Sequence, residues 1–393
     1  MNVQLGSVAG VNGWSESAPA YHGLYGGIPA NVANWIEQDI LQISHVTHKK
    51  QITLIDYGCG TGRYFPLYLD IAKKHGLDIK CLAFEPTLGQ LEISEKHLKE
   101  WGFRLKDNSF DRSLEKRKDQ LDGKKAPAGF RGPEYKKGGR GKGSLTVELI
   151  HGNIFPGQGA TYDPDYLEKE LFGKDHIDYG LCLFGVLSYI MGDANRVAML
   201  KTFTNIVNGP IRVSIPTQNR DRALYQEFEG LRSDLEAART IGDTARIREL
   251  ELKLKDTRDH GETITPFPAK DGETAHHPYY YVKNHKEFEG LLQRAGITDY
   301  EMCASNIDPE TVITDKNWPF RNIADALNSA TLKPKEMDHR AKFLMVKMQG
   351  QKALDVGFAP VTAADPKTIP YRVIQGPYHR ETLNAGKAPT ITA

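Results

Sequence analysis

Short apolar runs alternate along the chain with segments whose apolar residues recur at helical spacing. Runs that stop at a turn predict buried strands, and we expect strands at 51–56, 79–85, 145–150, 176–184, 211–216, 298–304 and 341–348. Helical spacing predicts helices at 28–43, 63–75, 88–101, 193–207 and 283–296. Strands and helices in alternation form parallel sheets with right-handed crossovers, so the pattern predicts an α/β fold.

Two segments interrupt this alternation. Residues 104–143 contain thirteen Lys and Arg against six Asp and Glu and are rich in Gly, which predicts a basic loop insertion. Residues 218–260 are strongly charged, with apolar positions at helical spacing on both sides of Gly242-Asp243, which predicts a helical hairpin. We therefore expect an N-terminal lid and first helix at 1–49, a main domain at 50–349 that carries both insertions, and a tail at 350–393.

Composition adds little about partners. Lys and Arg number 51 and Asp and Glu 50, so the overall charge favours no partner. None of the four cysteines forms a CxxC pair, which argues against a zinc site and suits reduced thiols in a cytoplasmic protein. There is no apolar run of about eighteen residues, so no transmembrane helix is expected.

A glycine turn follows the first predicted strand, in the sequence LIDYGCGTG that ends at Gly62. A strand, a glycine turn and a helix N-terminus form a cradle for nucleotide-like ligands, because glycines allow positive φ and close ligand approach. Dinucleotide sites use the spacing GxGxxG, whereas here the spacing is GxGxG with Asp56 two residues before the first glycine. A Rossmann-like domain for another nucleotide, or for none, is the alternative.

The segment LIDYGCGTG resembles motif I of class I S-adenosylmethionine-dependent methyltransferases. The resemblance extends over about 50–105 and 145–217 by motifs and over 280–348 by order of elements. It implies a Rossmann-like sheet of seven strands with helices on both faces. It also implies S-adenosylmethionine as the methyl donor and S-adenosylhomocysteine as the product.

The resemblance also assigns donor-binding residues. Asp56 and the turn would hold the methionine end, and Glu85, at the end of the second strand, would accept both ribose hydroxyls. Asn153 would contact the adenine amino group, at a position where Asp is commoner in the family. The expected donor-binding set is Asp56, Gly58, Gly60, Gly62, Glu85, Pro86, Asn153 and Phe184.

The acceptor side has no shared motif. Tyr21, His22 and Tyr189 are the catalytic candidates, and packing roles are the alternative for each. Ser188 and the run Tyr279, Tyr280 and Tyr281 are substrate candidates; the tyrosines could equally belong to an edge strand with one buried face. The neighbouring pair His276-His277 has no third ligand at a recognisable spacing, so no metal site is expected.

These observations predict an enzyme that transfers a methyl group to an unidentified acceptor, RNA or protein being the first choices. The basic insertion 104–143 could contact nucleic acid or could be only a solvated loop. The hairpin 218–260 could be a lid or could form a homodimer. Two alternatives stay open. One is a small-molecule methyltransferase, and the other is an inactive donor-binding module that acts through its insertions.

Overall fold

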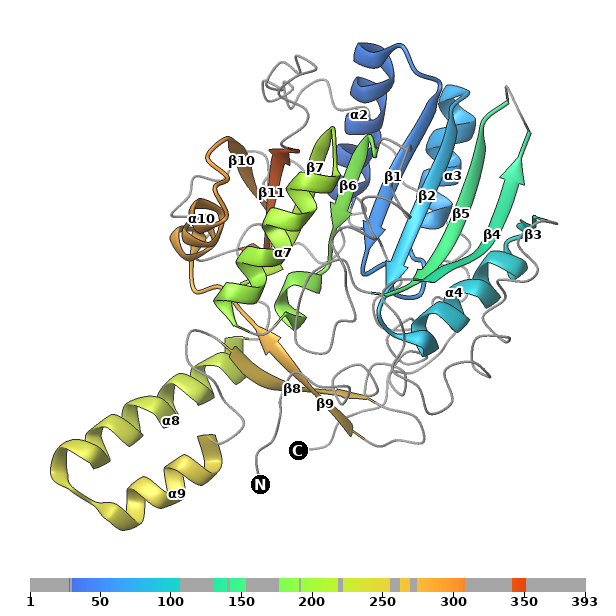
Figure 1. The fold of residues 1–393 in the computed structure, drawn as a ribbon. Helices are drawn as coiled ribbons and strands as arrows, with labels where there is room; N and C mark the ends of the chain where they lie inside the picture. The colour runs from blue at the N-terminus through green and yellow to red at the C-terminus, as the bar shows by residue number, and fades with distance from the viewer. Residues whose placement is uncertain are drawn as a thin grey trace, which may run out of the picture.

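The computed structural model describes residues 28, 30–106, 130–139, 142–152, 177–190, 192–217, 222–254, 262–268, 274–307 and 341–350. Within them, one nine-stranded sheet has the order β10-β11-β7-β6-β1-β2-β5-β4-β3, and β8 and β9 form a separate ribbon (Figure 1). The strands are β1 (Gln51–Tyr57), β2 (Asp78–Glu85), β3 (Arg104–Leu105), β4 (Phe130–Gly138), β5 (Ser144–His151), β6 (Tyr179–Cys182), β7 (Pro210–Pro216), β8 (Glu262–Pro268), β9 (Thr274–Tyr280), β10 (Tyr300–Ile307) and β11 (Ala341–Gln349). The helices are α2 (Ala30–Thr47), α3 (Phe65–His75), α4 (Leu88–Glu100), η3, a 3₁₀ turn (Val186–Tyr189), α7 (Asp193–Ile206), α8 (Arg222–Ile241), α9 (Thr244–Leu254) and α10 (His285–Arg294).

Each of the seven predicted apolar runs overlaps a strand of this sheet, but the expected count of seven strands is wrong, since the sheet has nine. The two additional strands, β3 and β4, come from residues that were expected to form a loop. β4 pairs antiparallel with β5 and buries Tyr135, and its register shifts between Arg131 and Glu134. At Gly132 a Cβ would lie 1.9 Å from the carbonyl oxygen of Leu149, so only glycine fits there. The glycine and lysine residues of β4 therefore belong to a bulged strand, where a loop was expected.

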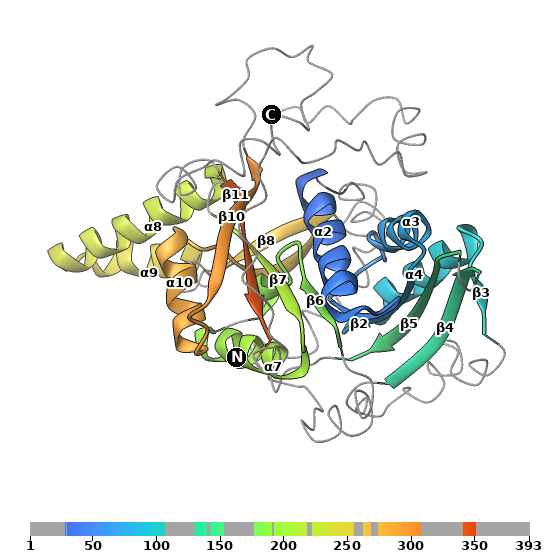
Figure 2. The same cartoon turned by 90° about the horizontal axis from the view of Figure 1, so that it is seen from above.

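The central strands are parallel, and helices cover both faces of the sheet. β1 pairs with β2 and β6, β2 pairs with β5, and β6 pairs with β7, all in parallel, whereas β11 runs antiparallel to β7 and β10. α2, α3 and α4 pack on one face, and α7 and α10 pack on the other (Figure 2). This is the Rossmann-like α/β arrangement that the sequence predicts.

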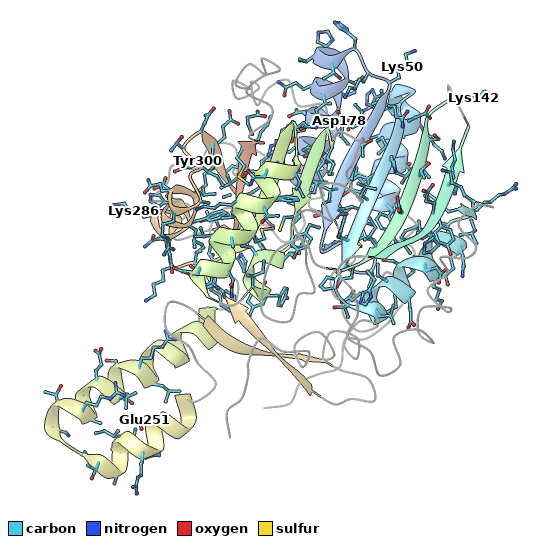
Figure 3. The ribbon with its side chains drawn as sticks, viewed as in Figure 1. Lys50, Lys142, Asp178, Glu251, Lys286 and Tyr300 are labelled. Carbon is cyan, nitrogen blue, oxygen red and sulfur yellow. The ribbon has the colours of Figure 1, made fainter. Side chains whose placement is uncertain are left out.

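The parallel strands all begin at one side of the sheet and end at the opposite side. Lys50, Lys142 and Asp178 stand at the edge where β1, β5 and β6 begin (Figure 3). The glycine turn follows β1 at the opposite edge, where ligands bind in open α/β sheets.

The second insertion, which follows β7, begins and ends at residues that lie side by side. The amide of Val282 donates to the carbonyl of Pro216 at 3.1 Å, and Thr217 forms a parallel bridge with Val282. Between these residues, α8 and α9 form the predicted helical hairpin, which projects away from the sheet (Figure 1). Its role in dimer formation stays a prediction.

A buried ionic cluster joins α2 to three strands of the sheet. Asp39 on α2 accepts hydrogen bonds from Tyr179 on β6 at 2.8 Å and from Arg212 Nη2 on β7 at 3.1 Å, and it pairs with Lys347 on β11 at 2.8 Å. All four side chains are buried. Although burial opposes ionisation of Asp39, the charges of Arg212 and Lys347 outweigh it and hold the pKa of this carboxyl below its usual value.

Among the described residues, no helix is both long enough and apolar enough to cross a bilayer. In the same residues, no three His, Cys, Asp or Glu side chains gather in a way that could hold a metal ion.

Replacing Asp39 with Asn should lower the free energy of unfolding by about 3–5 kcal/mol, because Arg212 and Lys347 would stay buried without their counter-charge. Urea denaturation measures the loss. Glu37→Gln on the same helix is the matched control, because Glu37 pairs with Lys74 and His75 nearer the surface. That change should cost less than about 1 kcal/mol. Equal losses in the two variants would contradict the importance of the buried cluster.

Candidate active site

The glycine turn is tied to the end of β2. The amides of Gly58 and Cys59 both donate to the carbonyl oxygen of Phe84, at 2.8 and 3.0 Å. Gly58, Gly60 and Gly62 have φ values of 74°, 56° and 78°, a region that favours glycine. The turn therefore lies against the carboxyl end of β2, where Glu85 follows Phe84.

The three glycines differ in what surrounds them. A Cβ on Gly58 would lie 2.4 Å from a methyl group of Val186, and one on Gly62 would lie 2.4 Å from the Phe65 ring. At Gly60 the nearest atom would be Gln90 Oε1, at 3.4 Å. The bare faces of Gly58 and Gly62 are thus filled by the protein itself, whereas Gly60 keeps room for close approach of a ligand.

Glu85 reaches from β2 to the turn. Its Oε2 accepts the amide of Gly60 and its Oε1 accepts the amide of Thr87, both at 3.0 Å. Burial raises the pKa of the Glu85 carboxyl to about 7, although these two hydrogen bonds act to lower that pKa. Each carboxylate oxygen can accept a second hydrogen bond, so the side chain can still receive the hydroxyls of a diol.

Asp56 is the second buried carboxyl of the site. Tyr68 on α3 donates its hydroxyl to Asp56 Oδ2 at 2.9 Å. Burial raises the pKa of Asp56 to about 7, while the hydrogen bond from Tyr68 and the charge of Arg63 oppose the rise. Both acids therefore titrate near neutrality and can ionise fully when a cationic ligand arrives.

One face of α4 supports the turn, a feature that the sequence prediction missed. Ser94 Oγ donates to the carbonyl of Gly60 at 2.7 Å, and His97 Nδ1 lies 3.0 Å from the carbonyl of Thr61. Gln90 is buried, and no described group forms a hydrogen bond with its Oε1. The signal was the spacing of Gln90, Ser94 and His97, which places the three on one face of a helix that directly follows β2.

The end of β6 closes the other side of the turn. Phe184 has a φ of 60°, and its amide donates to Ser214 Oγ on β7 at 2.7 Å. Its ring lies under the guanidinium of Arg63, whose carbon is 3.5 Å from the ring centroid. Val186, two residues later, covers Gly58. The predicted donor-binding residue Phe184 thus does lie beside the turn.

The acceptor candidates separate into two groups. Tyr189 on η3 packs against Tyr279 on β9, and Tyr279 packs against Tyr281, with ring centroids 4.8 Å apart in both pairs. Ser188 is buried, and its hydroxyl has no hydrogen-bond partner among the described residues. These residues gather next to Gly185, since a Cβ there would lie 2.5 Å from the Tyr279 hydroxyl.

Tyr280 points elsewhere. Its hydroxyl donates to Glu287 at 2.9 Å, and Arg196 lies 3.7 Å from its ring centroid. This favours a packing role, against the substrate role predicted for it.

Pro86 contributes a backbone contact, because its carbonyl lies 3.0 Å from His151 Nε2. Three predicted site residues, Tyr21, His22 and Asn153, lie outside the described residues.

No family model matches this chain, and neither does any curated protein. Solved structures do match. A S-adenosylmethionine-dependent methyltransferase from Clostridium acetobutylicum is 10% identical, with 85% of this chain and 97% of that chain covered and a TM-score of 0.39. The CcbJ methyltransferase from Streptomyces caelestis is 8% identical, with 86% and 97% covered and a TM-score of 0.41. A chain from the complex of the Haloferax volcanii Trm112 methyltransferase activator with a putative methyltransferase is 10% identical, with 88% and 97% covered and a TM-score of 0.36.

These superpositions are partial, and the strand order and the place of the turn decide the fold. The GxGxG turn follows β1, the middle one of the five parallel strands, and antiparallel strands flank these five on both sides. The chain therefore has a Rossmann-like α/β fold, with the glycine turn at the end of its central parallel strand.

Gly58→Ala should lower the free energy of unfolding more than Gly60→Ala. Both changes place a side chain in the left-handed region, at a cost of about 1–2 kcal/mol. Gly58→Ala also forces Val186 to move, which adds about 1–3 kcal/mol. Urea denaturation of the two variants measures the difference. Equal losses would show that the packing of Val186 on the turn is unimportant.

Proposed function

We propose that this protein is an S-adenosylmethionine-dependent methyltransferase. The observation that carries the proposal is the pairing of Gly60 with Glu85. Gly60 has room for a ligand, and its amide donates to the carboxylate of Glu85 at the carboxyl ends of β1 and β2. A nucleoside bound over Gly60 would have its ribose diol within the reach of Glu85. Asp56 supplies a second negative charge for a donor that carries a sulfonium and an ammonium group.

The reaction requires alignment more than acid–base chemistry. In an in-line displacement, the acceptor atom forms a bond to the methyl carbon while the carbon–sulfur bond breaks and its electrons stay on sulfur. The protein must align the two reactants and exclude water. Phe184 and the residues of η3 would form the wall beside the methyl group. An oxygen or protonated nitrogen acceptor would also need a base, for which Tyr189, Tyr21 and His22 are proposed.

RNA or protein is the proposed acceptor. Support comes from the charge of the insertion 104–143, whose described part includes the lysines at the end of β4. RNA binding that weakens steeply with salt would favour RNA. A small-molecule acceptor and an inactive donor-binding module are the alternatives.

Two measurements test the proposal. S-adenosylmethionine at about 100 times its Kd should stabilise the protein by about 2.7 kcal/mol, which thermal unfolding detects. Incubation with methyl-labelled donor and cell extract, fractionated into RNA, protein and small molecules, should place label in one fraction. Donor binding without label transfer would identify the inactive module, and no binding by calorimetry would end the proposal.

Glu85→Gln should weaken donor binding about 10- to 100-fold, because a neutral amide replaces a charged acceptor of hydrogen bonds. Calorimetric titration with S-adenosylhomocysteine measures the effect. Glu100→Gln, at the exposed end of α4, is the matched control and should leave the affinity unchanged. Unchanged affinity in Glu85→Gln would remove the ribose-binding role.

Donor affinity should rise from about pH 6 to about pH 8 and level off above that. The carboxyls of Asp56 and Glu85 both have a pKa raised to about 7, so below this pH they hold protons that a cationic donor must displace. Binding near neutrality should therefore release protons, which calorimetry in buffers of different ionisation enthalpy counts. A pH-independent affinity with no proton release would contradict this coupling.

A further inference from the structure

Arg63 joins the glycine turn to the end of β6. It follows Gly62 directly, and its side chain is 6% exposed. The guanidinium carbon lies 3.5 Å from the centroid of the Phe184 ring and 5.7 Å from that of Tyr64. A permanent positive charge is therefore held at the carboxyl edge of β1 and β6.

This is the edge position at which the strand order reverses. β1 has β2 on one side and β6 on the other, and ligands of open α/β sheets bind in the crevice at such a point. Glu85 stands on the β2 side and Arg63 extends to the β6 side. A nucleoside held by its ribose at Glu85 would thus have Arg63 on the opposite side of β1, where the substituent on its ribose could extend.

Charge identifies the group that Arg63 suits. The two carboxyls of the site, Asp56 and Glu85, would repel an anion, whereas a guanidinium presents paired N–H donors that match a carboxylate. S-adenosylmethionine carries one carboxylate, at the end of the molecule opposite the adenine. A purely structural role, in which Arg63 only stacks on Phe184 and balances Asp56, is the alternative.

We propose that Arg63 binds the carboxylate of the donor's amino acid end. This inference rests on the proposed function. It assigns a specificity role to a side chain that the motif comparison did not select. It also makes the carboxylate a group by which the site distinguishes S-adenosylmethionine from its decarboxylated form.

The test compares two ligands on two proteins. S-adenosylmethionine and decarboxylated S-adenosylmethionine differ only in the carboxylate, and calorimetry measures the Kd of each for the wild-type chain and for Arg63→Met. The wild type should bind the decarboxylated ligand about 10- to 100-fold more weakly, as expected for loss of a charge-assisted hydrogen bond. Arg63→Met should bind S-adenosylmethionine more weakly by a similar factor and should bind both ligands within about threefold of each other.

The ratio of the two affinities within one variant does not depend on how much of that variant is folded. Arg196→Met is the matched control, because Arg196 is also buried and stacks on a tyrosine, Tyr280, away from the turn. It should keep the wild-type ratio. Arg63→Lys should keep part of the discrimination, since it keeps the charge without the paired donors.

Equal binding of the two ligands by the wild type, or full discrimination in Arg63→Met, would overturn the role of Arg63 and leave the proposed function standing. Failure of the wild type to bind either S-adenosylmethionine or S-adenosylhomocysteine would overturn both.

Discussion

The site depends on one backbone constraint, the pair of hydrogen bonds from Gly58 and Cys59 to the carbonyl of Phe84. These bonds pull the turn after β1 onto the end of β2, and so bring Glu85 within 3.0 Å of the Gly60 amide. Phe84 is in register with Tyr57, the last residue of β1, so the contact follows from parallel pairing. The site is therefore a consequence of the sheet, which fixes the turn before any ligand is present.

The other walls of the site come from segments far away in the sequence. Val186 follows β6 and covers Gly58, while β9 arrives through the insertion after β7 and packs Tyr279 on Tyr189. Because the insertion begins and ends at the bridge between Thr217 and Val282, its ribbon reaches η3 without disturbing the strand order. The glycine turn and the tyrosine cluster thus have separate structural origins, which explains why a sequence motif marks the turn and none marks the tyrosines.

Local pattern was enough to predict the glycine turn and the two acids beside it. β1 and β2 are continuous apolar runs that end at polar residues, so the positions of Asp56 and Glu85 followed from the strand boundaries. β4 could not be predicted in the same way. Gly132 is required there because its backbone closely approaches Leu149, a residue of the strand that follows β4 in sequence. From composition alone, a glycine-rich segment predicts a loop. The supporting face of α4 was equally hidden, because Gln90, Ser94 and His97 are ordinary polar residues until the turn is placed beside them.

Phe184 shows most clearly what sequence cannot supply. A left-handed non-glycine residue costs about 1–2 kcal/mol, so other interactions must hold it there. Ser214 on the next strand accepts its amide, and the Arg63 guanidinium covers its ring. The conformation at the end of β6 thus depends on a side chain of β7 and on one from the turn after β1. A change at the glycine turn would therefore affect Phe184 directly, since Arg63 follows Gly62 and covers the Phe184 ring. This coupling requires no moving domain, only a strained residue held in place from two directions.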